Sequence, residues 1–212
     1  MNSKFIHKNY KFVKVDISLK KNIVNKISTI IKSEKKIDII INNAGVSVFT
    51  KYFKRTDREI NNTVDVNIKG VMNMINVYSE IHKKKKLKKC NIINISSIYG
   101  LLSPDFRVYG KKDRFNSEIY GATKASVIQL TKYYAVILSK DNININCISP
   151  GGILNKKNPQ SKNFIKKYSS RVPKGRMGEP EDLFTSILFL SSEQSNYIIG
   201  QNLVIDGGLS IW

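Results

Sequence analysis

Tyr120 and Lys124 are the two residues of this 212-residue chain whose types and spacing suggest chemistry most directly. The stretch from Ser117 to Leu130 has the character of a helix start, and four residues are about one helical turn, so the phenol and the ammonium would share a face. A nearby cation favours the charged form of an acid, so we predict that Lys124 lowers the pKa of Tyr120 below its usual value of about 10. Tyr120 could then act as a general acid or base. The alternative is an ordinary amphipathic helix that carries a surface Tyr and a surface Lys.

Two apolar runs upstream are followed by small polar residues. Residues 90–95 precede Ser96 and Ser97, and residues 37–41 precede the motif Asn42-Asn43-Ala44-Gly45. Short apolar runs of this kind are typical of buried parallel strands. Ligands of open α/β sheets bind beyond the carboxyl ends of the strands, so we expect these residues to meet at one site.

These motifs, taken in order, resemble the short-chain dehydrogenase/reductase family. The set is Asn42 to Gly45, Asn67 in the following helix, Ser97 after the next strand, the Tyr120-x-x-x-Lys124 pair and Pro150-Gly151. The resemblance extends from about Phe12 to the segment 200–208. It implies hydride transfer between a nicotinamide cofactor, NAD or NADP, and a secondary alcohol or ketone.

The resemblance also implies the catalytic roles. Tyr120 would exchange the hydroxyl proton, Ser97 would hydrogen-bond the same oxygen, and Lys124 would lower the pKa of Tyr120 and hold the ribose. Asn67 would order a water in the proton relay. Ser96 is the alternative for the serine role, and a helix asparagine with all its hydrogen bonds satisfied is the alternative for Asn67.

The cofactor-binding residues follow from the same resemblance, and no metal site is expected. Asp16 and Ile17 would contact the adenine, although Asp16 could instead simply end a strand. The Asn-Asn-Ala-Gly motif could be only a turn, but small residues there would let the backbone approach a ribose. The full set is Asp16, Ile17, Asn43, Ala44, Gly45, Tyr120, Lys124, Pro150, Gly151 and Ile153, the last through its backbone to the carboxamide.

We therefore expect one domain, residues 1–212, with an α/β fold: a doubly wound parallel sheet (Rossmann-type) that lacks the first β-α-β portion. No Gly-x-x-x-Gly-x-Gly turn precedes Lys11, and the chain begins where the third strand of the family is expected. The expected elements are strands at 10–16, 37–45, 90–95, 143–150 and 201–206, a helix capped by Ser18, helices at 57–82 and 119–139, a helix that starts at 179–182, and a flexible substrate lid at 155–176.

The segment between Ser97 and Tyr120 is longer than in most family members, and long loops are usually functional. We expect its charged and aromatic residues to lie over the reacting carbon and to suit a sugar derivative as the small-molecule substrate. These residues are Asp105, Arg107, Tyr109 and Arg114. The phrase from Ser97 to Phe106 is similar to dehydrogenases of bacterial surface-sugar and flagellin-glycan pathways.

The net charge of +20 would ordinarily suggest a nucleic-acid partner, but only six of the 36 basic residues are Arg. Proteins that bind nucleic acids use Arg for bidentate and stacked contacts, and the Lys residues here are scattered, so we expect no nucleic-acid partner. The two Cys lie in predicted buried strands and no apolar run is long enough to span a bilayer. These features predict a cytoplasmic protein that does not enter a membrane.

We expect a homodimer or homotetramer, with helices 57–82 and 119–139 at the two-fold interface. Apolar residues on the second helix exceed what one inner face requires: Val127, Ile128, Tyr134 and Ile137. A second function class stays open. Without the glycine-rich turn that binds the pyrophosphate, the chain could be a cofactor-deficient relative that serves as a binding or assembly module.

Overall fold

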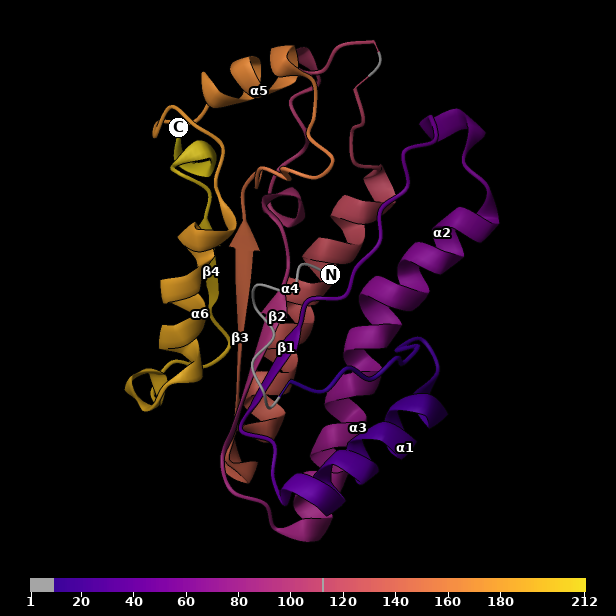
Figure 1. Ribbon diagram of the computed structural model, residues 1–212, viewed down its shortest axis with the longest axis vertical. Coiled ribbons are helices and arrows are strands. Elements are labelled where there is room, and N and C mark those ends of the chain that lie inside the picture. The colour runs from indigo at the N-terminus through magenta and orange to yellow at the C-terminus, as the bar shows by residue number, and fades with distance from the viewer. Residues whose placement is uncertain (1–9, 112) are drawn as a thin grey trace.

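The computed structural model describes residues 10–111 and 113–212, and its centre is a parallel sheet of four strands (Figure 1). The strands are β1 (Ile39–Asn42), β2 (Cys90–Ile95), β3 (Ile143–Pro150) and β4 (Asn202–Ile205), and they lie in the order β1-β2-β3-β4. Ile92 pairs with Ile40 on one side and with Ile145 on the other. The predicted doubly wound parallel sheet is confirmed.

Helices cover both faces of the sheet, because side chains alternate along each strand. Ile92 and Ile145 pack under α1 (Lys20–Glu34), α3 (Gly70–Lys85) and α4 (Glu118–Leu138), whereas Ile93 and Ile148 face α6 (Phe184–Ser191). Figure 1 shows α1, α3 and α4 together on one side and α6 on the other. The apolar runs of β2 and β3 are thus explained by burial on both faces.

The predicted helix 57–82 is continuous but contains a wider turn. Its first part, α2 (Asp57–Val64), begins at Thr56, which forms a capping box with Glu59. A π-helical turn, Asp65–Lys69, then leads into α3. Such turns are rare and are found frequently at functional sites, and this one carries Asn67.

The predicted lid is folded rather than loose. It contains α5 (Lys162–Ser169), capped by Ser161, whose Phe164 and Tyr168 pack in a small apolar cluster with Val108 and Val172. This cluster lies over the carboxyl ends of the strands (Figure 1). The many Lys and Ser residues pointed to a flexible segment and did not reveal the aromatic pair at i and i+4 that packs it, and the role as a substrate lid stays a prediction.

The predicted strand at 10–16 does not form. A strand needs a hydrogen-bonded neighbour, and residues 10–16 have none in the described part of the chain, where the sheet ends at β1. The predicted Ser18 cap is also wrong, because α1 starts after Leu19 and the Ser18 hydroxyl donates to the Asp16 carboxylate at 2.7 Å. On β1, Ile39 and Ile41 are 43% and 44% exposed on the face away from α1.

Three of the four residues offered for a subunit interface are buried within this chain. Val127, Ile128 and Tyr134 belong to the core under α4, and only Ile137 faces outward, next to exposed Tyr133 and Val136. Apolar surface on α4 therefore remains, but it consists of different residues. The last turn of α3 carries Lys83, Lys84 and Lys85, which suits the negative end of the helix dipole.

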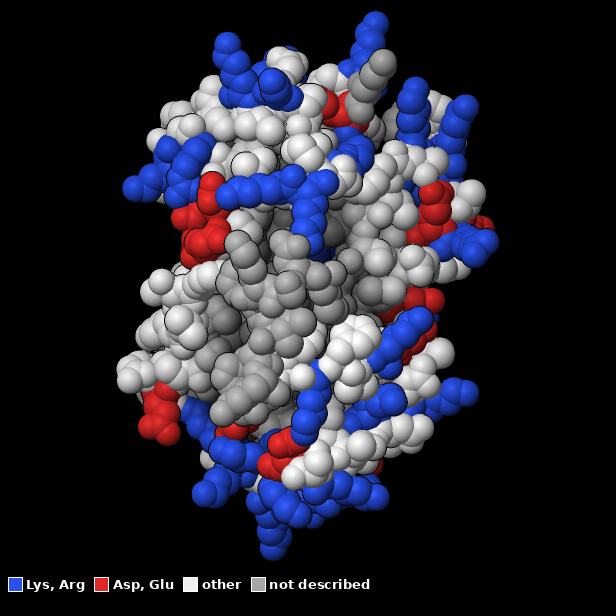
Figure 2. All heavy atoms as spheres, in the orientation of Figure 1, with Lys and Arg blue, Asp and Glu red and all other residues white. Residues whose placement is uncertain are grey.

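Basic side chains are scattered over the face seen in Figure 2, with acidic side chains between them. This is the distribution expected of solvated lysines on helix surfaces rather than of a continuous basic groove. In the described ranges, no helix is both long and apolar enough to cross a membrane.

Candidate active site

Ser97 and Tyr120 line one cavity of about 470 Å³, together with Gly151 and Ile153. Ser97 follows β2, Tyr120 lies in the first turn of α4, and Gly151 and Ile153 follow β3. The cavity is therefore at the carboxyl ends of adjacent parallel strands, where ligands of this fold class bind. Residues separated by more than fifty positions in the sequence meet here because the strands are parallel.

Tyr120 and Lys124 share one face of α4, with the Lys124 Nζ 5.6 Å from the centre of the phenol ring. Ser117 caps the helix, its hydroxyl accepting from the Tyr120 N–H at 3.2 Å. Lys124 is buried and donates to the Ile95 carbonyl at 2.8 Å. The common face predicted from the four-residue spacing is thus present.

The predicted lowering of the Tyr120 pKa by Lys124 is wrong for the chain on its own. Burial raises the pKa of the Tyr120 phenol above its ordinary value, and a hydrogen bond from Ser97 opposes this only in part. Burial also lowers the pKa of Lys124. Desolvation disfavours the charged form of each group, and the Lys124 ammonium is engaged by a carbonyl rather than by the phenol.

The structure separates the two candidate serines. Ser96 is buried and its hydroxyl donates to the Lys124 carbonyl at 2.7 Å, so it fastens β2 to α4. Ser97 faces the cavity, where its hydroxyl accepts from the Tyr99 N–H at 3.2 Å and lies in reach of Tyr120. The Ser97 hydroxyl can therefore donate to the oxygen of Tyr120 or of a substrate, whereas the Ser96 hydroxyl donates to the Lys124 carbonyl.

Two glycines let the serine turn approach α4. A Cβ on Gly121 would lie 2.9 Å from the Tyr99 carbonyl oxygen, and a Cβ on Gly100 would lie 2.8 Å from the backbone of Lys124 and Ala125. Both distances are shorter than ordinary van der Waals contact. The separation between Ser97 and Tyr120 therefore depends on two positions where any side chain would push the elements apart.

Asn67 clamps the loop that follows β1. Its Oδ1 accepts from the Val46 N–H at 2.8 Å, and its Nδ2 donates to the Val46 carbonyl at 2.9 Å and to the Thr123 hydroxyl at 3.0 Å. Both amide hydrogens and the oxygen have protein partners, which is the arrangement of a satisfied buried asparagine. The water-ordering role of Asn67 stays a prediction.

The segment from Asn43 to Gly45 is exposed at the end of β1. A Cβ on Gly45 would lie 3.5 Å from both the Asn67 Oδ1 and the Lys124 Nζ, so this backbone passes directly over the buried lysine. Asn42 turns inward instead and donates to the Asn94 side chain at 2.8 Å. The exposed backbone beside a cation provides room and charge for a sugar of the cofactor.

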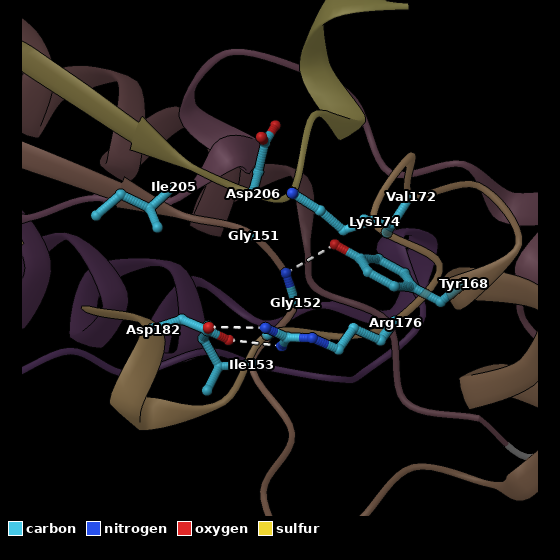
Figure 3. Close-up of a pocket in the computed structure, with 12 residues that line it drawn as sticks. Gly151, Gly152, Ile153, Tyr168, Val172, Lys174, Arg176, Asp182, Ile205 and Asp206 are labelled. Atoms are coloured by element: carbon cyan, nitrogen blue, oxygen red, sulfur yellow. Dashed lines mark hydrogen bonds and ion pairs between the residues drawn. The ribbon is translucent and has the colours of Figure 1, made fainter. Parts of the chain in front are cut away.

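Gly151, Gly152 and Ile153 line both the Tyr120 cavity and the adjoining pocket drawn in Figure 3. Gly152 donates to the Tyr168 hydroxyl at 2.7 Å, and Gly178 pairs with Ile153 as an isolated bridge. The bonds of that bridge use the Gly152 carbonyl and the Leu154 N–H. The N–H and C=O of Ile153 therefore point away from Gly178, as the expected backbone contact with a carboxamide requires.

The other predicted residues lie farther apart. Pro150 ends β3 and precedes Gly151. Asp16 and Ile17 lie outside the Tyr120 cavity, just before α1. The half-buried Ile17 packs against Gly70, and Asn73 donates hydrogen bonds to the carbonyls of Ile17 and Ser18, so this segment is held to α3. Hydrogen bonds from Ser18 lower the pKa of the Asp16 carboxyl.

The long loop divides between two cavities. Tyr109 and Arg114 line the Tyr120 cavity as expected. Asp105 and Arg107 instead line a neighbouring cavity of about 350 Å³, where Asp105 pairs with Arg107 and with Arg171. Their expected position over the reacting carbon was wrong, because the 3-10 turn Phe106–Val108 turns this part of the loop away.

Sequence analysis missed Tyr168 and Asn116. Tyr168 binds the Gly152 N–H and lines the cavity, and Asn116 fixes Ser47 through a side-chain hydrogen bond of 2.8 Å. The spacing of Phe164 and Tyr168 on one helical face was the signal for the first. Asn116 offered no signal, because its partner is 69 positions away.

The described residues fit a nicotinamide dinucleotide at its nicotinamide and ribose end. The observations are the exposed backbone from Asn43 to Gly45, the buried lysine beneath it and the outward backbone of Ile153. Among residues 10–111 and 113–212, no group of three or more metal-ligating side chains is assembled.

Comparisons with known proteins agree with this arrangement. The family model described as enoyl-(acyl carrier protein) reductase matches residues 3–210. A 3-oxoacyl-[acyl-carrier-protein] reductase of Thermotoga maritima is 33% identical over 189 residues, which are 87% of this chain and 71% of that protein.

Two solved structures carry bound cofactors. A short-chain dehydrogenase of Leptospira borgpetersenii with bound NAD+ is 40% identical, with a TM-score of 0.90 over 99% of this chain and 79% of that one. A gluconate 5-dehydrogenase of Burkholderia cenocepacia in complex with NADP and tartrate is 26% identical, with a TM-score of 0.81 over 92% of this chain and 73% of that one. The chain belongs to the short-chain dehydrogenase/reductase family and is an NAD(P)-dependent oxidoreductase.

Proposed function

We propose that this chain, as a single domain, interconverts a secondary alcohol and a ketone in a sugar derivative, with Tyr120 as the proton-transferring residue. The observation that carries the proposal is the convergence of Ser97 and Tyr120 on one cavity whose wall is Gly151 to Ile153. Amide side chains in the same cavity, Asn155 and Gln160 among them, suit a ligand with several hydroxyl groups.

The roles of the residues follow from their positions. In reduction, the Tyr120 phenol gives its proton to the carbonyl oxygen, and in oxidation the phenolate takes the hydroxyl proton. Ser97 donates a hydrogen bond to the same oxygen, which stabilises the charge that develops there. The nicotinamide supplies or accepts the hydride when it is bound.

The cofactor-holding residues fall into two groups. Lys124, with the backbone from Asn43 to Gly45, would hold the ribose next to the nicotinamide, and Ile153 would hold the carboxamide through its backbone after Pro150 and Gly151. Asp16 and Ile17, placed just before α1, would contact the adenine. The Lys124 ammonium would also stabilise the Tyr120 phenolate once a ribose hydroxyl takes the place of the Ile95 carbonyl as its partner.

Two further features belong to the same proposal. A homodimer or homotetramer is supported by exposed Tyr133, Val136 and Ile137 on α4, which form an apolar row that no described segment covers. A cytoplasmic location is supported by Cys90 and Cys147, which are buried and unbridged.

Calorimetric titration with NADH, NADPH and a DNA duplex, each into the same chain, tests the proposal. We expect heat of binding from at least one nicotinamide cofactor and none from DNA at about 0.15 M salt, where scattered lysines are screened. Loss of that heat in a Gly45→Val variant, whose side chain would lie against Asn67 and Lys124, would place the binding at the proposed site. Binding of DNA but of neither cofactor would reject the proposal.

A further inference from the structure

Arg114 is the one charged side chain among the described residues that line the Tyr120 cavity. Every other residue there is apolar, aromatic, a glycine or an uncharged polar residue. None of the ion pairs in the described part of the chain involves Arg114, in contrast to Arg107 and Arg171 of the neighbouring cavity, which share Asp105. The charge of Arg114 is therefore not neutralised by a carboxylate.

The Arg114 guanidinium is held in place from two sides. Its Nη2 donates to the Asn158 carbonyl at 3.0 Å, and the group lies 6.0 Å from the centre of the Phe49 ring. The backbone carbonyl of Arg114 accepts from the Gln160 side chain at 2.7 Å. The long loop and the segment before α5 thus fix a cation that would otherwise be a flexible surface residue.

Hydrogen-bonding capacity remains on this guanidinium. Arginine has five N–H donors in a planar fork, and the contacts within residues 10–111 and 113–212 engage only Nη2, with the carbonyls of Asn158 and Pro159. The donors on Nε and Nη1 remain for a ligand. A negatively charged group with several oxygens is the best match to a guanidinium.

We propose that Arg114 selects a substrate that carries a carboxylate or a phosphate, placed away from the carbon that Tyr120 serves. This inference rests on the proposed function, because it names the substrate class of the same cavity. A neutral polyol would leave a partly buried cation without a counter-charge, whereas an acidic one would supply it. The uncharged amide side chains of the cavity then form hydrogen bonds with the hydroxyl groups that lie between the anionic group and the reacting carbon.

Binding of matched acidic and neutral ligands tests the inference without reference to turnover. D-gluconate and D-sorbitol differ in one terminal group, a carboxylate against a hydroxymethyl, and D-glucose 6-phosphate and D-glucose form the corresponding phosphate pair. Affinities are measured by ligand-observed NMR at about 0.15 M salt for the unmodified chain, Arg114→Gln and Arg107→Gln. Arg107→Gln is the control, because it removes the same charge from the same loop outside the cavity.

We expect at least one acid to bind about tenfold more tightly than its neutral partner, and we expect Arg114→Gln to remove that preference while Arg107→Gln retains it. The pair that shows the preference identifies carboxylate or phosphate. Equal binding within both pairs, no binding of any of the four ligands, or an equal effect of the two variants would overturn the inference. Tyr120→Phe should leave the preference unchanged, so the proposed reaction can fail while this inference stands.

Discussion

Single residues decide which of two adjacent serines serves the reaction. The resemblance to the family favoured Ser97 and left Ser96 as the alternative, since strand alternation alone does not say which face will carry the cavity. In the structure the Ser96 hydroxyl donates to the α4 backbone and Ser97 faces Tyr120. The same limit applies to Asn67, whose side-chain partners, Val46 and Thr123, come from distant segments.

We predict opposite effects for alanine at these two serines. Ser97→Ala should lower turnover by about 10²-fold, the usual cost of one donor to a developing oxyanion, with little change in stability. Ser96→Ala should remove the hydrogen bond that fastens β2 to α4 and lower the free energy of unfolding by about 0.5–1.5 kcal/mol. Turnover and urea unfolding of both variants check this, and a loss of turnover that is greater in Ser96→Ala would reverse our assignment.

At the scale of elements, the prediction succeeded where hydrophobic periodicity was strong. The buried strands and the long helices were all found, because runs such as 90–95 are dominated by isoleucines and carry no charged residue. The pairing of the expected strand at 10–16 and the packing of the lid segment were not predicted correctly, because both depend on contacts between residues far apart in the sequence. Residues 10–16 have strand composition without a neighbour, and Phe164 with Tyr168 gives order to a segment rich in Lys and Ser.

The contact between the serine turn and α4 gives a prediction at this scale. Gly121→Ala in a helix would normally raise stability by about 0.5–1 kcal/mol. Here the new Cβ would lie 2.9 Å from the Tyr99 carbonyl, so we expect a loss of about 1–3 kcal/mol and a fall in turnover as Ser97 moves from Tyr120. Thermal unfolding measures the loss of stability and a turnover assay measures the fall in activity. Ala122→Ser, on the exposed face of the same helix, is the control. A Gly121→Ala variant that is more stable and fully active would refute the close packing.

The whole molecule presents two surfaces that the described residues leave open. One is the apolar row on α4. If it is a subunit interface, the chain is a dimer or tetramer by light scattering at micromolar concentration, and Val136→Lys shifts it toward monomer, because a charge would be buried in the contact. Leu101→Lys, at an exposed position elsewhere, is the control. A monomeric unmodified chain would contradict the proposal.

The other open surface is the end of the sheet at β1, where the outer edge of the strand is unpaired in the described residues and Ile39 and Ile41 are exposed on the face away from α1. Parallel sheets are normally covered on both faces, and no described segment places backbone N–H groups of a glycine-rich turn where a pyrophosphate would lie. We predict that the 212-residue chain binds NADH at least about tenfold more weakly than a polypeptide that adds a Gly-x-x-x-Gly-x-Gly strand-helix-strand unit ahead of Met1. Calorimetry on both polypeptides checks this, and equal affinities would mean that another segment holds the phosphates.

The central claim is that Tyr120 transfers the proton during hydride transfer. Single-turnover absorbance at 340 nm, with millimolar cofactor to offset weak binding, compares the unmodified chain with Tyr120→Phe and with Tyr133→Phe, an exposed tyrosine of the same helix. Because oxidation needs the Tyr120 phenolate, the rate of alcohol oxidation should increase with pH until that phenol is ionised. We predict that Tyr120→Phe lowers the rate by about 10²-fold or more and abolishes this pH dependence. Tyr133→Phe should change neither the rate nor its pH dependence. A Tyr120→Phe variant that keeps the rate of the unmodified chain would contradict the account.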